Sequence, residues 1–149
     1  MSDIKNGSDR SVGRRTLLGG AAMVAAAASM AGGGPAMASA ADTRVVFDHH
    51  LGAFAQGIDA LMADYTETSV IFTPDAEIRG LEAIRSFFQA FLDSATPEFW
   101  ASFKVLNQSV DGAVAYLVWS AMPTIPMATD TLYVQNGKIE VQTFTPFSA

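Results

Sequence analysis

One acidic residue near the C-terminal end of the sequence falls where the pattern predicts an apolar environment. Residues 127–144 read MATDTLYVQNGKIEVQTF, and the Asn-Gly pair at 136–137 is typical of a two-residue β-hairpin turn. Counting outward from that turn pairs Asp130 with Thr143. The same face carries four apolar residues, which are Leu132, Val134, Ile139 and Val141. We therefore predict that Asp130 lies on the apolar face of the hairpin and Gln142 on the opposite, wetter face.

Two interpretations of Asp130 follow from this placement. A carboxylate in an apolar cavity has a pKa raised by desolvation, so Asp130 would be able to accept or donate a proton during a reaction. Alternatively, Asp130 forms a structural hydrogen bond with Thr143 at the end of a strand near solvent. The pattern does not decide between the two, and both stay open.

His49 and His50 are adjacent in a segment with helical periodicity. At 100° per residue, His50 lies on the same side as Phe47 and Phe54, whereas His49 points to the opposite side. We predict that His50 enters the interior, either as an acid–base partner of Asp130 or as a hydrogen-bonded core histidine. A His–Asp pair in a cavity suits proton abstraction beside a carbonyl, or the elimination of water.

Metal and thiol chemistry are not expected. The chain contains no cysteine, which excludes disulfides and thiolate ligands. The two histidines project to different sides of a helix, and no third ligand has a suitable spacing. We expect neither a metal nor a cofactor.

The periodicity predicts α-helices first and a β-sheet afterwards. The expected helices are Val45–Tyr65, capped by Asp42 or Thr43 and interrupted at Gly57, and Leu81–Leu92, closed by Thr96-Pro97. The expected strands are Ser69–Pro74, Phe99–Val110, Ala113–Met122, Thr129–Gln135 and Lys138–Phe144, with a turn or small hairpin at 74–80 and a linker at 122–127. This order indicates an α+β fold in which helices pack on one face of a curved, mainly antiparallel sheet. The space between the helices and the sheet then forms a cone-shaped barrel with an open mouth.

Aromatic residues are spread over all of these elements. We predict that six of them contact a ligand in the cavity: Phe54, Tyr65, Phe72, Trp100, Tyr116 and Trp119. The alternative is that they belong to the ordinary hydrophobic core.

The first forty residues differ from the rest of the chain. Arg14 and Arg15 precede an uncharged, Ala- and Gly-rich run from Thr16 to Met30, and small residues follow at 38–40 as Ala-Ser-Ala. A basic start, an apolar middle and an A-x-A end are typical of an export signal. The paired arginines resemble a twin-arginine signal, although the usual Phe and Lys are missing from GRRTLLG. We predict that residues 1–40 are a signal peptide, that residues 41–149 are the mature domain, and that this domain is periplasmic or secreted.

The predicted mature domain is strongly acidic. It contains 13 Asp and Glu against 5 Lys and Arg, a net charge of −8. Such a charge disfavours binding to nucleic acid and to anionic membranes. We therefore expect no nucleic-acid partner and no membrane association after cleavage of the signal.

Two further segments are informative, DYTETSVIFTPDAEIRGLEAIRSFF at 64–88 and TDTLYVQNGKIEVQTF at 129–144. They resemble nuclear-transport-factor-2-like (NTF2-like) proteins, in particular the SnoaL-like branch with its polyketide cyclases and ketosteroid isomerase relatives, and the resemblance extends over nearly all of residues 44–146. It implies the same cone-shaped fold, but this fold carries many reactions as well as binding proteins. Thr73 stands where the isomerase relatives have a general-base carboxylate, which argues against ketosteroid isomerase activity as such. Nor do Arg44, Arg79 and Arg85 suit the Asp–Arg–Asp set of epoxide-hydrolase relatives.

Three functions remain open at this point. The first is a cofactor-independent isomerase, lyase or cyclase that acts on a small hydrophobic molecule, with Asp130 and His50 transferring protons. The second is a periplasmic protein that binds such a molecule without turnover. The third is a dimeric interaction module, because relatives commonly form homodimers through the outer face of the sheet. Leu106, Leu117 and Trp119 are the residues that we expect on that outer face.

Overall fold

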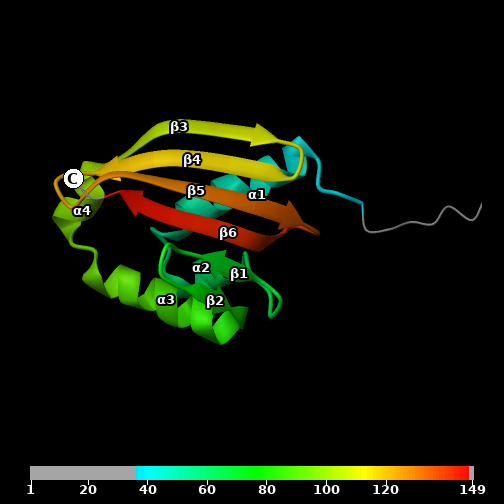
Figure 1. The fold of residues 1–149 in the computed structure, drawn as a ribbon, viewed down its shortest axis with the longest axis horizontal. Helices are drawn as coiled ribbons and strands as arrows, with labels where there is room; N and C mark the ends of the chain where they lie inside the picture. The colour runs from blue at the N-terminus through cyan, green and yellow to red at the C-terminus, as the bar shows by residue number, and fades with distance from the viewer. Residues whose placement is uncertain (1–35, 148–149) are drawn as a thin grey trace, which may run out of the picture. The chain divides into compact units, whose positions relative to one another are not determined.

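The computed structural model describes residues 36–147, which belong to one compact unit of the chain and contain four helices and six strands (Figure 1). The helices are α1 (Ala40–Ala53), α2 (Ile58–Met62), α3 (Gly80–Ser94) and α4 (Pro97–Ser102). The strands are β1 (Val70–Phe72), β2 (Glu77–Arg79), β3 (Phe103–Asp111), β4 (Val114–Ala121), β5 (Ile125–Gln135) and β6 (Lys138–Phe147). The predicted export signal lies, up to residue 35, outside the described residues.

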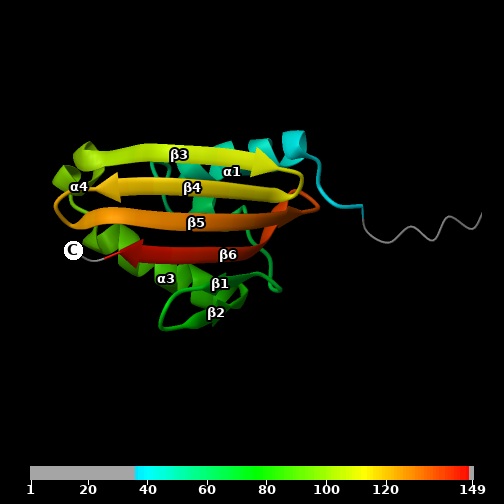
Figure 2. The ribbon, with the colours of Figure 1, turned by 45° about the horizontal axis from the view of Figure 1, so that its top comes forward.

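All six strands of this part of the chain form one sheet, in the order β2-β1-β6-β5-β4-β3. Every neighbouring pair is antiparallel except β1 and β6, which are parallel. Figure 2 shows β3 to β6 side by side, with α1 and α3 behind them on one face of the sheet. The predicted α+β class, with helices on one face of a curved and mainly antiparallel sheet, is confirmed.

The first helix begins earlier than the sequence pattern predicts. Its N-cap is Ser39, whose hydroxyl accepts a hydrogen bond from the backbone N–H of Asp42 at 3.2 Å. The Asp42 carboxylate in turn accepts from the backbone N–H of Ser39 at 3.2 Å, which completes a capping box. The expectation that Asp42 or Thr43 caps the helix is therefore wrong, because Asp42 serves as the third helical residue. The predicted interruption at Gly57 is confirmed, and its φ of 99° explains why glycine occupies the position.

The segment before β3 is helical, although the sequence pattern predicts that the strand starts at Phe99. Thr96 caps α4 by accepting a hydrogen bond from the Phe99 N–H at 3.2 Å, and Pro97 occupies the first helical position. Thr96-Pro97 therefore starts a new helix as well as ending α3. As a result, Phe99 and Trp100 belong to a short helix, α4, which lies at one end of the sheet (Figure 1).

The β5–β6 hairpin contains the predicted turn and an irregularity that the pattern does not reveal. The turn residues 136–137 have φ values of 52° and 71°, as a type I′ turn requires. Val134 pairs with Ile139, but the next pair is Tyr133 with Val141, so Glu140 is an extra residue in β6. This β-bulge shifts the pairing by one residue along the rest of the hairpin.

The hydrophobic core fills the base of the cone, between the helices and the concave face of the sheet. Its largest fully buried apolar side chains come from α1, α2, α3 and three of the strands, and they are Phe47, Leu61, Ile71, Ile84, Leu132, Val134 and Ile139. No helix in the described part of the chain is long and apolar enough to cross a membrane. The core thus ties the helices to the sheet at one end, while the other end holds the cavity described below.

Thr43 contributes the one buried side-chain polar atom of residues 36–147 without a hydrogen-bond partner. Its side chain is completely buried in α1, so the hydroxyl loses its hydration without a compensating bond. We predict that Thr43→Val, which replaces the hydroxyl with a methyl group of similar shape, raises the free energy of unfolding by about 1 kcal/mol. Urea denaturation monitored by circular dichroism measures this. Thr129→Val, at a half-buried position of β5, is the control, and a loss of stability in Thr43→Val would contradict the prediction.

Candidate functional site

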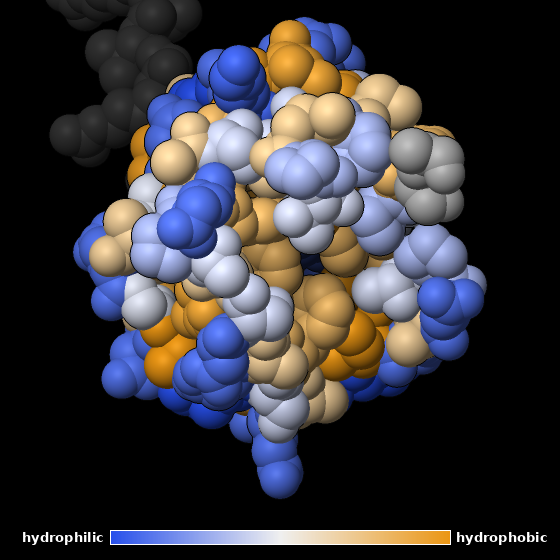
Figure 3. Space-filling model, turned by 90° about the vertical axis from the view of Figure 1, so that its left-hand side faces the viewer, coloured by the Kyte–Doolittle hydropathy of each residue, from blue (hydrophilic) through white to orange (hydrophobic). Residues whose placement is uncertain are grey.

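A cavity of about 480 Å³ opens between the helices and the concave face of the sheet. Figure 3 shows a hollow on the side of residues 36–147 where α4 lies. Hydrophobic side chains form the walls of this hollow, and hydrophilic side chains surround it. Seventeen residues line the cavity: Phe47, His50, Leu51, Phe54, Ala55, Phe87, Phe88, Phe91, Phe99, Trp100, Phe103, Leu117, Trp119, Asp130, Leu132, Gln142 and Phe144. The lining contains no lysine and no arginine. Its polar groups come from His50, Asp130 and Gln142, and the rest of the wall is apolar and mostly aromatic.

Asp130 lies on β5 with its carboxylate at the cavity, and its side chain is buried. Trp119 Nε1 donates a hydrogen bond to Oδ2 at 2.7 Å, and Gln142 Nε2 donates to Oδ1 at 2.9 Å. Burial raises the pKa of Asp130, and these two bonds together with the nearby His50 ring offset part of that rise. Of the two interpretations of Asp130, the cavity placement agrees with the structure. The predicted structural bond to Thr143 is wrong, because Thr143 pairs with Thr131 and the partners of Asp130 are Trp119 and Gln142.

The bulge at Glu140 explains why the predicted neighbours of Asp130 differ from the observed ones. Beyond the bulge, Asp130 pairs with Phe144 instead of Thr143. The side chains of β6 exchange faces at the same point, so Gln142 turns inward and becomes buried. The prediction that Gln142 lies on the wetter face is therefore wrong. The extra residue thus turns Gln142 inward, and the Gln142 side-chain amide donates to the Asp130 carboxylate.

Tyr65 supports this arrangement from below the cavity. Its hydroxyl donates to Gln142 Oε1, which leaves the Gln142 amide N–H to donate to Asp130. Burial raises the pKa of Tyr65 well above its usual range, and the charges of Asp130 and Asp64 raise it further. The phenol thus remains a donor. Tyr65 does not line the cavity, whereas its partner Gln142 does, so the lining does not support the predicted contact of Tyr65 with a ligand.

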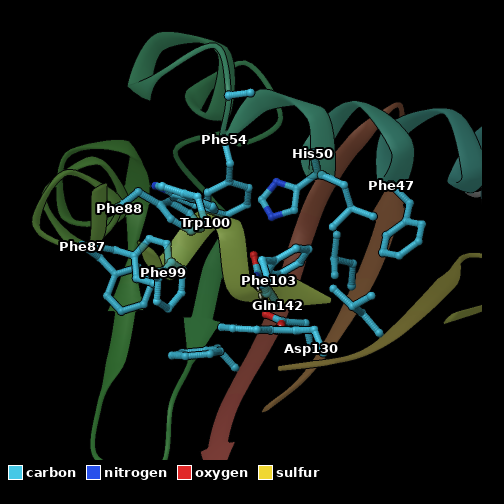
Figure 4. Close-up of a pocket in the computed structure, with 17 residues that line it drawn as sticks. Phe47, His50, Phe54, Phe87, Phe88, Phe99, Trp100, Phe103, Asp130 and Gln142 are labelled. Atoms are coloured by element: carbon cyan, nitrogen blue, oxygen red, sulfur yellow. Dashed lines mark hydrogen bonds between the residues drawn. The ribbon is translucent and has the colours of Figure 1, made fainter. Parts of the chain in front are cut away.

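His50 faces the cavity from α1, opposite the sheet wall that carries Asp130 and Gln142 (Figure 4). Its ring is buried and makes edge contacts with the rings of Phe54, Tyr65 and Phe88, at centroid distances of 5.3 to 5.9 Å. The helical periodicity therefore places His50 correctly. Whether His50 and Asp130 act in catalysis stays a prediction.

Asp64 is a site residue that the sequence reasoning missed. Its buried carboxylate lies between the two histidines, at 2.6 Å from His49 Nδ1 and 3.3 Å from His50 Nδ1. Asp64 follows the end of α2, where helical periodicity no longer indicates direction. The only signal in the sequence is an acidic residue beside Tyr65 at the end of an apolar stripe.

The predicted aromatic contacts divide into two groups. Phe54, Trp100 and Trp119 line the cavity. Phe72 and Tyr116 do not, and they are 38% and 37% exposed. Because side chains alternate along a strand, these two point away from the face that carries their buried neighbours. Seven further aromatic residues line the cavity without having been predicted as ligand contacts, which are Phe47, Phe87, Phe88, Phe91, Phe99, Phe103 and Phe144.

Only one of the three residues that we predicted on the outer, dimer-forming face of the sheet is exposed. Leu117 and Trp119 are buried and face the cavity, whereas Leu106 is 54% exposed. The alternation along β4 therefore places two of the three predicted residues on the wrong side of the sheet. The homodimer itself stays a prediction.

The remaining charged groups lie outside the cavity. Exposed ion pairs join Arg44 to Asp48, Arg79 to Glu77 and Arg85 to Asp59. Thr73, at the position of the missing general base, accepts a hydrogen bond from the Ala76 N–H at 3.0 Å in the β1–β2 turn. Among residues 36–147, no group of three or more His, Cys, Asp or Glu side chains is arranged to bind a metal ion.

The fold that these elements form is the NTF2-like cone. An NTF2-like protein of unknown function from Mesorhizobium loti matches with a TM-score of 0.61 and 19% identity, covering 73% of this chain and 93% of that chain. A SnoaL-like protein of unknown function from Burkholderia thailandensis E264 matches with a TM-score of 0.61 and 11% identity, covering 76% and 100%. A proposed polyketide cyclase from Sinorhizobium meliloti has a TM-score of 0.57 and 20% identity, covering 70% and 97%. No family model matches the sequence, and neither does any curated protein.

The raised pKa of Asp130 predicts an unusual pH dependence of stability. The folded state retains the Asp130 proton to a higher pH than the unfolded chain, in which the pKa is near the ordinary 3.8. Ionised Asp130 therefore costs the folded state free energy at neutral pH, and lowering the pH through the folded pKa removes this cost. We predict that wild type gains stability relative to Asp130→Asn as the pH falls from about 7 to about 4.

Urea denaturation at several pH values measures this difference, because groups common to both proteins cancel. Asp111→Asn is the control, since Asp111 is exposed at the end of β3 and is not expected to produce the same trend. A difference between wild type and Asp130→Asn that stays constant, or that shrinks as the pH falls, would contradict a raised pKa at Asp130.

Proposed function

We propose that the protein binds a small, neutral, hydrophobic organic molecule in the aromatic cavity and catalyses proton transfer on it, as an isomerase, lyase or cyclase without a cofactor. The observation that carries this proposal is a carboxylate with a raised pKa and an imidazole that face one apolar cavity from opposite walls. The likeness in fold to a proposed polyketide cyclase supports a reaction of this class. The proposal itself depends on the site and not on the fold.

The lining favours a neutral ligand with one polar group. Pockets of this kind typically enclose roughly 70–90% of the surface of a ligand, and aromatic walls suit flat, apolar rings. Ionised Asp130 would repel an anionic ligand, and the lining contains no lysine or arginine to compensate for the burial of an anion. A carbonyl oxygen is a suitable polar group, because protonated Asp130 is able to donate a hydrogen bond to it.

The two titratable groups supply complementary steps. In its protonated form, which burial favours, Asp130 donates its proton to the carbonyl oxygen, while His50 Nε2 accepts a proton from the neighbouring carbon. The electron pair of the broken C–H bond forms the C=C bond of an enol. Return of the proton from His50 to a different carbon of a conjugated enol, with the enol proton going back to Asp130, gives an isomer. Where the next carbon carries a hydroxyl group, the enol proton returns to Asp130, the carbonyl re-forms, the C=C bond moves one position, and the hydroxyl group leaves as water with the proton from His50. The alternative function is binding in the same cavity without turnover, which the absence of a carboxylate at Thr73 favours.

A matched pair of naphthalene derivatives tests the binding step. We predict that the neutral ketone 2-acetylnaphthalene raises the melting temperature and quenches tryptophan fluorescence, whereas 2-naphthoate does neither. Trp100→Ala should weaken ketone binding about 10-fold, because Trp100 lines the cavity. Tyr116→Ala is the control and should leave binding unchanged, since Tyr116 lies on the other face of the sheet. Equal binding of the ketone and the carboxylate would overturn the proposed ligand class.

Exchange of the ketone methyl protons with deuterium oxide tests turnover. We predict that wild type accelerates this exchange and that His50→Gln and Asp130→Asn each reduce the acceleration about 100-fold, as for the loss of a general acid or base. Proton nuclear magnetic resonance (NMR) measures the exchange directly. Binding without accelerated exchange would support the non-catalytic alternative.

We also propose that the chain is exported and that its signal is cleaved after Ala38. The twin-arginine-like pattern supports export to the periplasm or beyond. Both Ala36-Met37-Ala38 and Ala38-Ser39-Ala40 have the A-x-A form. Cleavage after Ala40 would remove Ser39 and its capping box, at a cost of about 1 kcal/mol, whereas cleavage after Ala38 retains it.

The intact mass of the exported protein distinguishes the two cleavage sites. We predict a mature chain that begins at Ser39, and that it is more stable to urea than a chain that begins at Ala41. The Ser39→Ala variant is the control, because it should remove the same cap from the longer chain. A mature chain that begins at Ala41 with undiminished stability would contradict this assignment.

A further inference from the structure

Asp64 joins two consecutive histidines of α1 through its two carboxylate oxygens. Oδ1 lies 2.6 Å from His49 Nδ1, and Oδ2 lies 3.3 Å from His50 Nδ1. The Asp64 and His50 side chains are 7% and 4% exposed, whereas that of His49 is 44% exposed. The carboxylate therefore connects a ring inside the cavity to a ring at the surface.

The chain holds Asp64 in place from two directions. The residue follows α2, and its backbone N–H donates to the Leu61 carbonyl at 3.1 Å. Its own carbonyl accepts from the Ile139 N–H at 2.8 Å, at the start of β6. The backbone of Asp64 is thus tied both to the helical layer and to the sheet. Its side chain has a defined direction toward α1.

The hydrogen bonds that the Asp64 carboxylate accepts determine which ring nitrogens of His49 and His50 carry protons. An ionised carboxylate only accepts hydrogen bonds, so each Nδ1 beside it must carry its hydrogen. With one proton on each neutral ring, Nε2 of His50 is then unprotonated. No hydrogen bond among the described residues involves that Nε2, and His50 lines the cavity. Its lone pair is therefore available to a molecule in the cavity.

We propose that Asp64 is the positioning residue for His50, and that His49 holds the other oxygen of the Asp64 carboxylate. Asp64 sets the tautomer of His50 so that Nε2 acts as the proton acceptor, which rests on the function proposed above for this cavity. It also stabilises the positive charge that His50 acquires on taking a proton. The shorter bond to His49 fixes the carboxylate, so the surface histidine determines the geometry of a group that never contacts the ligand.

Nitrogen-15 NMR of the ligand-free protein at alkaline pH tests the tautomer, because it distinguishes protonated from unprotonated ring nitrogens. We expect His50 to carry its proton on Nδ1 in wild type. In Asp64→Asn, the amide offers one acceptor and one donor to the two rings, so His50 should become a mixture of tautomers. Asp64→Ala should leave His50 mostly with its proton on Nε2, the form that a free imidazole prefers.

Three further variants separate positioning from general damage to the fold. Asp48→Asn removes a neighbouring acid of α1 that pairs with exposed Arg44, and it should leave the His50 tautomer unchanged. His49→Gln retains a hydrogen-bond donor and should preserve the wild-type tautomer, whereas His49→Leu should shift it part of the way toward Asp64→Ala. The tautomer reports on Asp64 even if a variant loses stability, provided that the spectrum remains that of a folded protein.

The outcomes distinguish this inference from the proposed function. If His50 carries its proton on Nε2 in wild type, or if Asp64→Asn leaves the tautomer unchanged, Asp64 is not the positioning residue. If the tautomer is as expected and Asp64→Asn slows ketone exchange about 10- to 100-fold, both proposals are supported. If the tautomer is as expected but wild type neither binds nor exchanges the ketone, the positioning role stands and the proposed function fails.

Discussion

Asp130 is a carboxylate in an aromatic cavity, and the removal of its hydration must be offset by hydrogen bonds from the protein. Trp119 and Gln142 each donate to one oxygen, and Tyr65 holds Gln142 in the orientation that this requires. The neighbouring strands β4 and β6 thus both supply a donor to β5. This constraint accounts for the polar side chain of Gln142 on the inner face of the sheet, beside Asp130, and for the hydroxyl of Tyr65 behind it.

The cavity exists because the helices and the sheet separate toward one end of the cone. Apolar residues of α1, α2 and α3 fill the base, while aromatic residues of α3, α4 and the strands stand around the opening. Rings that meet at steep angles, such as Phe99 and Trp100 with an interplanar angle of 90°, form walls without closing the space. His50 on the helical wall and Asp130 on the sheet face the same cavity. One apolar cavity therefore contains one acid and one base.

The elements of the fold were largely predictable because each is encoded locally. Apolar residues at three- and four-residue spacings revealed the helices, Gly57 revealed their break, and the turn at 136–137 revealed the last hairpin. The bulge at Glu140 was not predictable, because an extra residue in a strand changes no local composition and depends on what the opposite strand requires. Ser39 and Thr96 are residue types that commonly cap helices. Ser39 was overlooked in favour of Asp42 or Thr43, and Thr96 was assigned only to the end of α3.

For the site, the sequence by itself determined that Asp130 and His50 face inward, because alternation in a strand and rotation in a helix are properties of the local chain. Only the tertiary structure decided their partners. Gln142 contacts Asp130 because the bulge shifts the pairing of β5 with β6 by one residue. Asp64 contacts both histidines from the turn after α2, where the helical periodicity of the sequence no longer applies. Partners of this kind depend on contacts between residues far apart in the sequence, and local patterns contain no measure of those distances.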